Sequence, residues 1–129
     1  MTLERLNPGP RMSEAVRIGD IVFLAGQVPD DLSGDITAQT REVLANVDAV
    51  LRALGGSKAD IASVQVWLSD MADFAGMNAV WDDWVDDANP PARATGGVAL
   101  ARPGMRVEMI VIAHLSHWER SGRESPASS

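Results

Sequence analysis

The chain lacks cysteine and tyrosine altogether, although it has 129 residues. Without cysteine it can form no disulfide, bind no metal through a thiolate and use no thiol as a nucleophile. No apolar run approaches the roughly 18 residues that a membrane-spanning helix needs, and the N-terminal residues lack the apolar core of a signal peptide. These absences predict a cytoplasmic protein with no membrane partner.

Basic residues are also scarce. One lysine and ten arginines stand against eighteen acidic residues, which gives a formal net charge of -7. A surface that binds nucleic acid needs clustered lysine and arginine, because much of its affinity comes from contacts with phosphates. We therefore expect no nucleic-acid partner.

What is present is the composition of an ordinary globular protein, with 46% hydrophobic residues. The length suits one hydrophobic core rather than two. We expect a single domain over residues 1–117, followed over residues 118–129 by a polar, serine-rich tail that is disordered.

Turn residues and hydrophobic periodicity predict the first half of the secondary structure. A short apolar element at 3–6 is followed by strands at 14–18 and 21–25, which Gly19-Asp20 joins as a hairpin. A helix begins after Asp35, a residue type that caps helix N-termini, and ends at Gly55-Gly56. Residues 61–68 alternate as a strand, with Ala62, Val64, Val66 and Leu68 on one side and Ser63, Gln65 and Trp67 on the other.

The second half contains another helix and two more strands. The helix spans about 71–85, with a core-facing stripe of Phe74, Met77, Trp81 and Trp84. Strands follow at 92–100 and 106–115, on either side of Pro103-Gly104, which suits a type II turn. The helix end is acidic over 82–87, which indicates either a solvated end or a site for a cation or partner.

This order of elements predicts an α+β fold, a mixed sheet with both helices packed on one face. The opposite face of the sheet then has no cover within the chain, although several strands are apolar on both sides. Oligomerisation is the natural way to cover such a face.

Few side chains offer chemistry. His114 and His117 lie at the end of the last strand, where a catalytic triad or a metal site is not expected. The tryptophans suit packing, and Gly96-Gly97 suits a place where a backbone is closely approached. We expect no metal and no cofactor.

Two charged residues lie inside apolar strands, Arg93 and Glu108. A buried charge is costly unless it is paired, so each needs a partner. The two residues form a structural ion pair, or Glu108 faces water, or both belong to a site. If the two strands formed a tight hairpin, the pair would lie about 20 Å apart at the usual rise per residue. Either the strands are not hairpin partners, or the residues meet across a subunit boundary.

Several stretches of the sequence resemble the RidA/YjgF family. They are 22–28 (VFLAGQV), 73–78 (DFAGMN), 91–95 (PARAT) and 107–113 (VEMIVIA), and the likeness extends over roughly residues 10–115. The resemblance implies a chorismate-mutase-like α+β fold that assembles as a homotrimer with a cleft between neighbouring subunits.

The resemblance also implies an activity, the hydrolysis of reactive 2-enamine and 2-imine acids such as 2-aminoacrylate to 2-oxo acids and ammonia. It implies that Arg93 anchors the carboxylate of a small substrate and that Glu108 positions the attacking water. A guanidinium suits a planar carboxylate, and a carboxylate can act as a general base. Gly26, Thr95 and Asn78 are the further substrate-binding residues that it implies.

The sequence departs from the family pattern at three positions. The N-terminal tyrosine of the deaminases is absent, Ala25 occupies their serine position and Thr95 their frequent cysteine position. Two alternatives to the deaminase therefore stay open. One is an enzyme of the same scaffold that acts on another small carboxylate, and the other is a non-catalytic binding or chaperone-like trimer.

Overall fold

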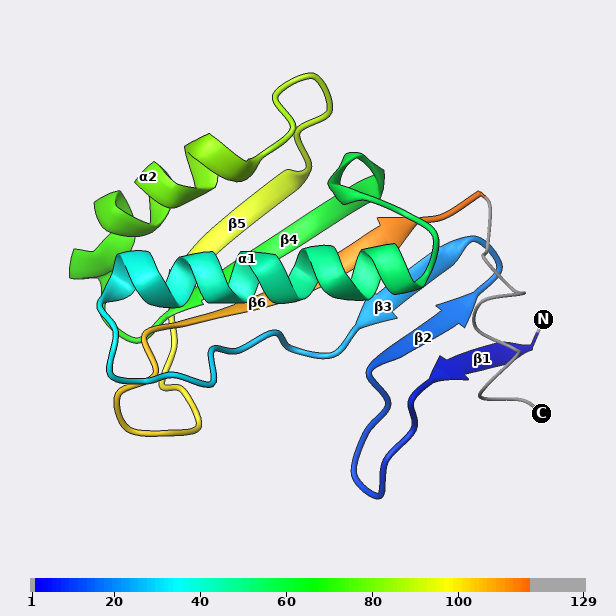
Figure 1. Ribbon diagram of the computed structural model, residues 1–129, viewed down its shortest axis with the longest axis horizontal. Helices are drawn as coiled ribbons and strands as arrows, with labels where there is room; N and C mark the ends of the chain where they lie inside the picture. The colour runs from blue at the N-terminus through cyan, green and yellow to red at the C-terminus, as the bar shows by residue number, and fades with distance from the viewer. Residues whose placement is uncertain (1, 117–129) are drawn as a thin grey trace.

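The computed structural model describes residues 2–116. It has six strands, two α-helices and two short 3₁₀ turns (Figure 1). The elements are, in chain order, β1 Leu3–Leu6, β2 Ala15–Ile18, β3 Ile21–Leu24, α1 Ile36–Ala53, η1 Lys58–Asp60, β4 Ile61–Leu68, η2 Met71–Asp73, α2 Phe74–Trp84, β5 Ala92–Gly97 and β6 Val107–His114. The predicted tail lies outside the described residues, as does His117, so its disorder stays a prediction.

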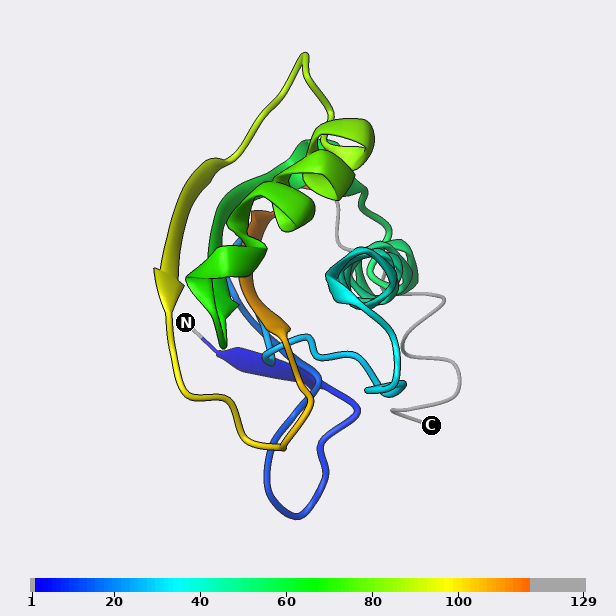
Figure 2. The same ribbon diagram turned by 90° about the vertical axis from the view of Figure 1, so that its left-hand side faces the viewer.

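The strands form one mixed sheet in the order β1-β2-β3-β6-β4-β5. All neighbours are antiparallel except β4 and β5, which run parallel and are joined through α2. Both helices lie on the same face of the sheet (Figures 1 and 2). The predicted α+β class, with two helices on one face, is confirmed. Among residues 2–116, no helix is long and apolar enough to cross a membrane.

The local signals at turns and helix ends are confirmed. Asp35 caps α1, and its carboxylate accepts a hydrogen bond from the Ala38 N–H at 2.9 Å. Gly55 follows the helix with φ of 84°, a conformation that favours glycine. At the other predicted turn, Gly104 has φ of 86° and the Met105 N–H donates to the Arg102 carbonyl. That is the geometry of a type II turn with Pro103 and Gly104 at its centre.

The core lies between the helices and the sheet. Val43, Val47 and Leu51 of α1 are fully buried against the sheet face that carries Val64 and Val66 of β4. Strand β6 alternates with the same period, with Val107, Met109, Val111 and Ala113 all buried on the helix side. Burial of one face and exposure of the other fixes the register of these strands, because a slip of one residue would turn every side chain to the wrong face.

Two predicted side-chain placements are wrong. Ala62 is exposed, because a bulge between Ile61 and Ser63 shifts the alternation of β4 and buries Ile61 instead. Phe74 is 41% exposed, because the buried side of α2 is centred on Met77, Val80 and Trp81 and Phe74 stands at its margin. Other differences concern extent: the apolar element at 3–6 is a sixth strand, 71–73 is a 3₁₀ turn, and β5 ends at Gly97.

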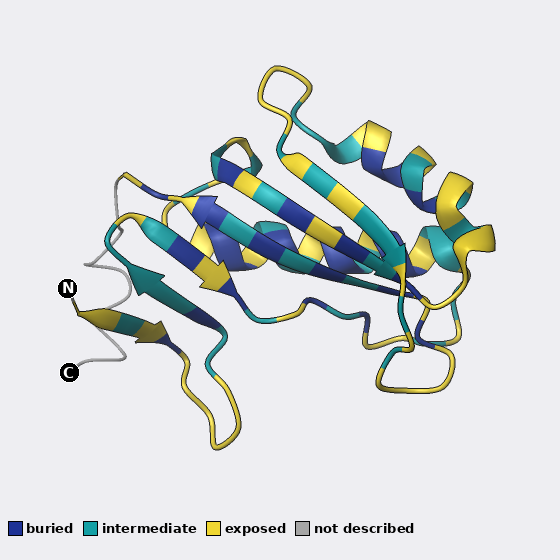
Figure 3. Cartoon of the chain, turned by 180° about the vertical axis from the view of Figure 1, so that it is seen from behind, coloured by how far each residue is buried: buried dark blue, intermediate teal, exposed yellow. Residues whose placement is uncertain are grey.

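The face of the sheet opposite the helices, called the open face below, has no cover within the described residues. Viewed from behind, its strands are in front of the helices and carry exposed and partly buried residues (Figure 3). Phe23 of β3, an apolar side chain in the middle of the sheet, is 44% exposed on this face. Ile110 and Ile112 of β6 are only partly buried there. The predicted lack of cover is confirmed.

Candidate functional site

Arg93 lies on the edge strand β5 and points toward α2. It is opposite Val64 in register, so both side chains are on the helix side of the sheet. Its guanidinium carbon is 5.0 Å from the centre of the Trp81 ring, and its Nη1 is 3.9 Å from the Met77 sulfur. No carboxylate of residues 2–116 forms an ion pair with it. The guanidinium therefore rests on an indole face and keeps most of its hydrogen-bond donors free.

Two features of its surroundings act on the pKa of Arg93 in opposite directions. Burial lowers the pKa of the guanidinium, while the nearby Asp82 carboxylate acts to raise it. Arginine stays charged at neutral pH in any case. Asp82 belongs to the acidic end of α2, so part of that acidic segment serves to balance this cation.

Two polar side chains beside Arg93 lack partners. Thr95 is two residues further along β5, on the same side of the strand, and Asn78 follows Met77 on the inner side of α2. The hydroxyl oxygen of Thr95 and the amide oxygen of Asn78 are both buried without a hydrogen bond. Buried polar atoms are normally paired, so these orphan oxygens mark the space between β5 and α2 as a place for a ligand or a partner chain. We call Arg93, Thr95 and Asn78 the arginine cluster.

Glu108 lies on β6 and points to the open face. Its neighbours across the sheet are Trp67 of β4 and Gly26, which follows β3. The carboxylate oxygen Oε2 occupies the place where a side chain on Gly26 would begin, so only glycine leaves room for it. Within residues 2–116 the carboxylate has no hydrogen bond or ion pair, and burial raises its pKa. We call Glu108 and Gly26 the glutamate cluster.

The five predicted site residues thus form two clusters on opposite faces of one sheet. Strand β4 lies between β5 and β6, so the strands of Arg93 and Glu108 are not hairpin partners. Arg93 is level with Val111, whose side chain is on the helix side, whereas Glu108 is three residues away on the open side. An ion pair within one chain is therefore excluded as the explanation of these two charges.

Trp67 is a neighbour of Glu108 that sequence reasoning assigned to packing. It is directly opposite Glu108 on β6 and Gly96 on β5, and it is only partly buried on the open face. The signal for this was its alternation with Ser63 and Gln65, two polar residues on the same side of the strand. Trp81 and Trp84, by contrast, pack between the helices and the sheet as predicted, with ring centres 5.4 Å apart.

The remaining candidates take no part in either cluster. His114 is exposed at the end of β6, and its Nε2 is 4.0 Å from an Asp20 oxygen. In the acidic segment, Asp86 accepts hydrogen bonds from the Ala88 N–H and the Asn89 amide, which is an ordinary turn. Among residues 2–116, no group of three or more acidic or histidine side chains lies close enough together to hold a metal ion.

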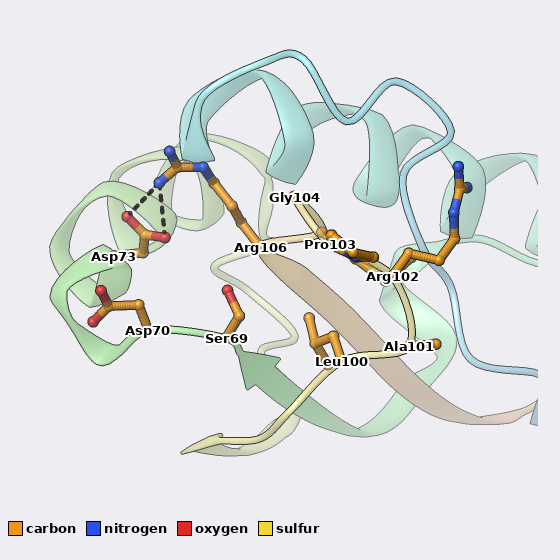
Figure 4. Close-up of a pocket in the computed structure, with 10 residues that line it drawn as sticks. Ser69, Asp70, Asp73, Leu100, Ala101, Arg102, Pro103, Gly104 and Arg106 are labelled. Carbon is orange, nitrogen blue, oxygen red and sulfur yellow. Dashed lines mark hydrogen bonds and ion pairs between the residues drawn. The ribbon is translucent and has the colours of Figure 1, made fainter.

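A cavity of about 640 Å³ lies away from both clusters, beyond the last residues of β4 and β5 (Figure 4). Arg106 reaches across it to Asp73 at 3.3 Å, while Arg102 points away from that pair. Its walls come from residues 69–73 and 100–106 and include neither Arg93 nor Glu108. Of its charged residues, Arg106 and Asp73 are paired with each other.

Comparison with known proteins gives matches along almost the whole chain. A family model described as endoribonuclease L-PSP matches residues 2–115. A RutC family protein from Haemophilus influenzae is 40% identical over 114 residues, which cover 88% of this chain and 98% of that protein. The RutC family protein YoaB from Escherichia coli is 36% identical over 113 residues, with 88% and 98% covered.

Solved structures agree with these sequence matches. A member of the YjgF protein family from Neisseria meningitidis has a TM-score of 0.85 and 41% identity, over 91% of this chain and 98% of that one. A protein of the Rid family from Yersinia pestis has a TM-score of 0.77 and 33% identity, over 83% of this chain and 89% of that one.

Proposed function

Because this chain belongs to the RidA/YjgF family and has its chorismate-mutase-like α+β fold, we propose that it hydrolyses reactive 2-enamine and 2-imine acids to 2-oxo acids and ammonia. The reaction takes place in a cleft between two subunits of a homotrimer. The arginine cluster of one subunit forms one wall of this cleft, and the glutamate cluster of its neighbour forms the other.

Assembly of several copies is what would bring an arginine cluster and a glutamate cluster to the same substrate. The open face leaves Phe23 exposed and Ile110 and Ile112 only partly buried, and a second copy would remove these side chains from water. The same face carries Glu108, whereas the arginine cluster lies at the β5 edge of the sheet. When the β5 edge of one subunit meets the open face of another, a guanidinium and a carboxylate face the same space from different chains.

Arg93 holds the substrate carboxylate in this proposal. Its guanidinium lies against the Trp81 ring and forms no ion pair among residues 2–116, although the Asp82 carboxylate is near enough to act on its pKa. A planar carboxylate fits a guanidinium through two parallel hydrogen bonds, which fix its orientation as well as its position. The orphan oxygens of Thr95 and Asn78 are placed to receive donors of the substrate or of ordered water beside it.

Glu108 acts as the general base and then as the general acid. It takes a proton from water while the water oxygen bonds to the imine carbon, C2, and the C=N electron pair moves to nitrogen, which takes up a proton from solvent. The resulting carbinolamine collapses to the 2-oxo acid when its hydroxyl releases a proton to solvent and the nitrogen leaves as ammonia with the proton that Glu108 returns. A raised pKa suits this double role, because proton exchange is most effective when the pKa approaches the working pH.

One observation carries the proposal. The two charges in the apolar strands are each partly buried, and neither is paired within residues 2–116. Unpaired charges in such positions cost stability, so they are retained for a partner outside the chain. In a 2-imino acid the carboxylate is the partner of Arg93, and the water that attacks the imine carbon is the partner of Glu108.

The test is a hydrolysis assay on 2-iminopropionate, generated in place from alanine by an amino-acid oxidase. We expect the unmutated protein to consume the imine faster than buffer alone, and Arg93→Ala and Glu108→Gln to lower kcat/KM by at least about 100-fold. Arg102→Ala is the matched control, since Arg102 is an exposed arginine outside both clusters.

Size-exclusion chromatography with light scattering has to show that each variant keeps the mass of the unmutated assembly. No acceleration by the unmutated protein would refute the deaminase activity. Normal turnover by Arg93→Ala would refute only the role of the arginine. A monomeric yet fully active protein would refute the intersubunit cleft.

A further inference from the structure

Three residues form a row across the open face, one on each of three adjacent strands. Trp67 of β4 is opposite Gly96 of β5 on one side and opposite Glu108 of β6 on the other. The proposed base therefore has the Trp67 indole as its direct neighbour toward the β5 edge. Within residues 2–116 the indole neither stacks on another aromatic ring nor donates a hydrogen bond.

Gly96 leaves space beside that indole. A Cβ built on Gly96 meets no atom of the described residues within 4 Å, and its φ is not positive. Neither crowding nor backbone conformation therefore explains a glycine in the middle of this strand, where glycine is a poor strand former. The space over Gly96 is continuous with the side of Trp67, because the two residues are paired in register.

The glutamate cluster limits where the substrate can extend. On the side of Glu108 away from Trp67 is Gly26, whose close contact with the carboxylate leaves no room between them. Along β6 the next residue on the same face is Ile110, whose Cδ1 is 3.4 Å from the place of a Cβ on Gly26. The accessible surface around Glu108 therefore has Trp67, Ile110 and the backbone of Gly96 beside it, with the exposed Gln65 of β4 opposite Ile110 at its margin.

The chemistry of a 2-imino acid decides what meets this surface. Its C2 carries three groups in one plane: the carboxylate, the imine nitrogen and the side chain. In the proposed cleft the carboxylate goes to Arg93 of the neighbouring subunit and the attacking water lies by Glu108. The side chain is the group left to occupy the surface beside the base.

We propose that Trp67, Gly96 and Ile110 form the side-chain subsite of this cleft and select 2-imino acids with a planar aromatic or large apolar side chain over small or charged ones. The inference rests on the function proposed above and names its substrate class. Trp67 is the specificity-determining residue, and Gly96 is the residue whose missing side chain admits the substrate.

The experiment compares two imines generated by the same oxidase, 2-iminopropionate from alanine and 2-imino-3-phenylpropionate from phenylalanine. We expect the unmutated protein to have a kcat/KM about tenfold higher for the phenyl substrate, the effect of one aromatic contact together with its apolar area. Trp67→Ala is expected to bring the ratio of the two kcat/KM values to about one, because it removes the aromatic contact that only the phenyl side chain can use fully.

Two further variants separate a subsite from a mere packing role. Gly96→Val fills the space beside the indole with a good strand former, so it lowers kcat/KM for the phenyl substrate more than for iminopropionate. Phe23→Ala, assayed as an assembly with the mass of the unmutated protein, is the matched control, because Phe23 is also an exposed aromatic residue of the open face but lies on β3, away from this row. It leaves the ratio of the two substrates unchanged.

The remaining outcomes show separately whether the subsite or the deaminase activity is wrong. An equal loss of both substrates in Trp67→Ala, or a change of oligomeric mass in that variant, overturns the subsite and makes Trp67 a contact between copies. If the unmutated protein hydrolyses neither imine, the deaminase activity fails, and calorimetric binding of phenylpyruvate and pyruvate then judges the subsite alone. Tighter binding of phenylpyruvate that Trp67→Ala abolishes supports it, and equal or absent binding overturns it.

Discussion

Arg93 and Glu108 extend from opposite faces of the same sheet, on strands that β4 separates. Both are charged groups in apolar strands, and neither forms an ion pair within residues 2–116. A single substrate cannot contact both residues of one chain, since the sheet itself lies between them. If both act on one substrate, they come from different subunits.

Mixed assemblies test this arrangement. Arg93→Ala lacks the anchor and Glu108→Gln lacks the base, so each is expected to be inactive alone. In a trimer formed at random from equal amounts, about one quarter of the clefts combine an intact arginine with an intact glutamate. We expect about a quarter of the unmutated rate after the two variants are unfolded together and refolded, measured with 2-iminopropionate.

The control is the same mixture prepared without unfolding, in which the subunits stay segregated and the rate stays near the background. Mass spectrometry of the intact assemblies shows whether mixed trimers have formed. Mixed trimers without recovered activity would contradict a cleft shared by two subunits. Because the sheet keeps the two residues of one chain apart, that result would mean that one of them takes no part in the reaction.

The pH dependence of the activity follows from Glu108. Burial raises the pKa of this carboxyl above 4.5, the ordinary value of a glutamate. A general base acts only when it is ionised, so kcat/KM falls as the pH drops through the raised pKa of the free enzyme. We expect the acidic limb of the pH–rate profile above pH 4.5, and a profile that falls only below pH 4 would contradict this role.

The same shift makes Glu108 a cost to the stability of the folded chain at neutral pH. The folded state holds the Glu108 proton more tightly than the unfolded state, so this group favours folding fully only below its unfolded pKa. That contribution is lost as the pH rises through the folded pKa. Glu108→Gln should therefore have a higher Tm than the unmutated protein at pH 7, with a gap that shrinks toward pH 4. A lower Tm for the variant at pH 7 would show that the carboxylate has a stabilising partner in the assembly.

Gly26 offers a way to move the base without removing it. A methyl group at this position would occupy the place of the Glu108 carboxylate oxygen, which is the free end of a flexible side chain. Gly26→Ala is therefore expected to rotate the carboxylate away, with a change of stability within about 1 kcal/mol and a loss of activity of at least about tenfold. Gly97→Ala is the matched control, because its methyl group would come no closer than 3.4 Å to Met71. Full activity in Gly26→Ala would mean that the position of the Glu108 carboxylate does not matter to the reaction.

Sequence reasoning predicted the parts of the fold that depend on near neighbours. The cap at Asp35, the turn at Pro103-Gly104 and the extent of β4 follow from residues close together in the chain. It did not predict that β4 separates β5 from β6, because strand pairing depends on contacts far apart in sequence. The bulge that exposes Ala62 also has no local signal, since the strand alternates correctly on either side of it.

The candidate site was predictable in its charges but not in its geometry. Arg93 and Glu108 stand out because charged residues are rare inside apolar strands. Which face each one occupies depends on the pairing with β4, and only the structure provides that. Trp67 was missed because an aromatic residue in a strand suits a core as well as a surface, and its neighbour Gly96 carries no side chain from which to infer contact.

Gln39 shows how the start of β6 is held in place, two residues before Glu108. This fully buried side chain donates to the carbonyls of Gly34 at 3.0 Å and Gly104 at 2.9 Å and accepts from the Arg106 N–H at 2.8 Å. It therefore ties α1 to the turn that leads into β6. Thr40, the next residue, is equally buried, but its hydroxyl has no partner.

These two neighbours make a matched pair for a stability measurement. Gln39→Ala removes three hydrogen bonds made by a fully buried side chain, so we expect a loss of about 3 kcal/mol in the free energy of unfolding. Thr40→Val replaces an unpaired hydroxyl by a methyl group of similar shape, which should change that free energy by no more than about 0.5 kcal/mol or raise it. Urea denaturation followed by far-ultraviolet circular dichroism measures both. Equal losses in the two variants would mean that the hydrogen bonds of Gln39 add nothing beyond packing, and that the position of β6 is fixed by the sheet alone.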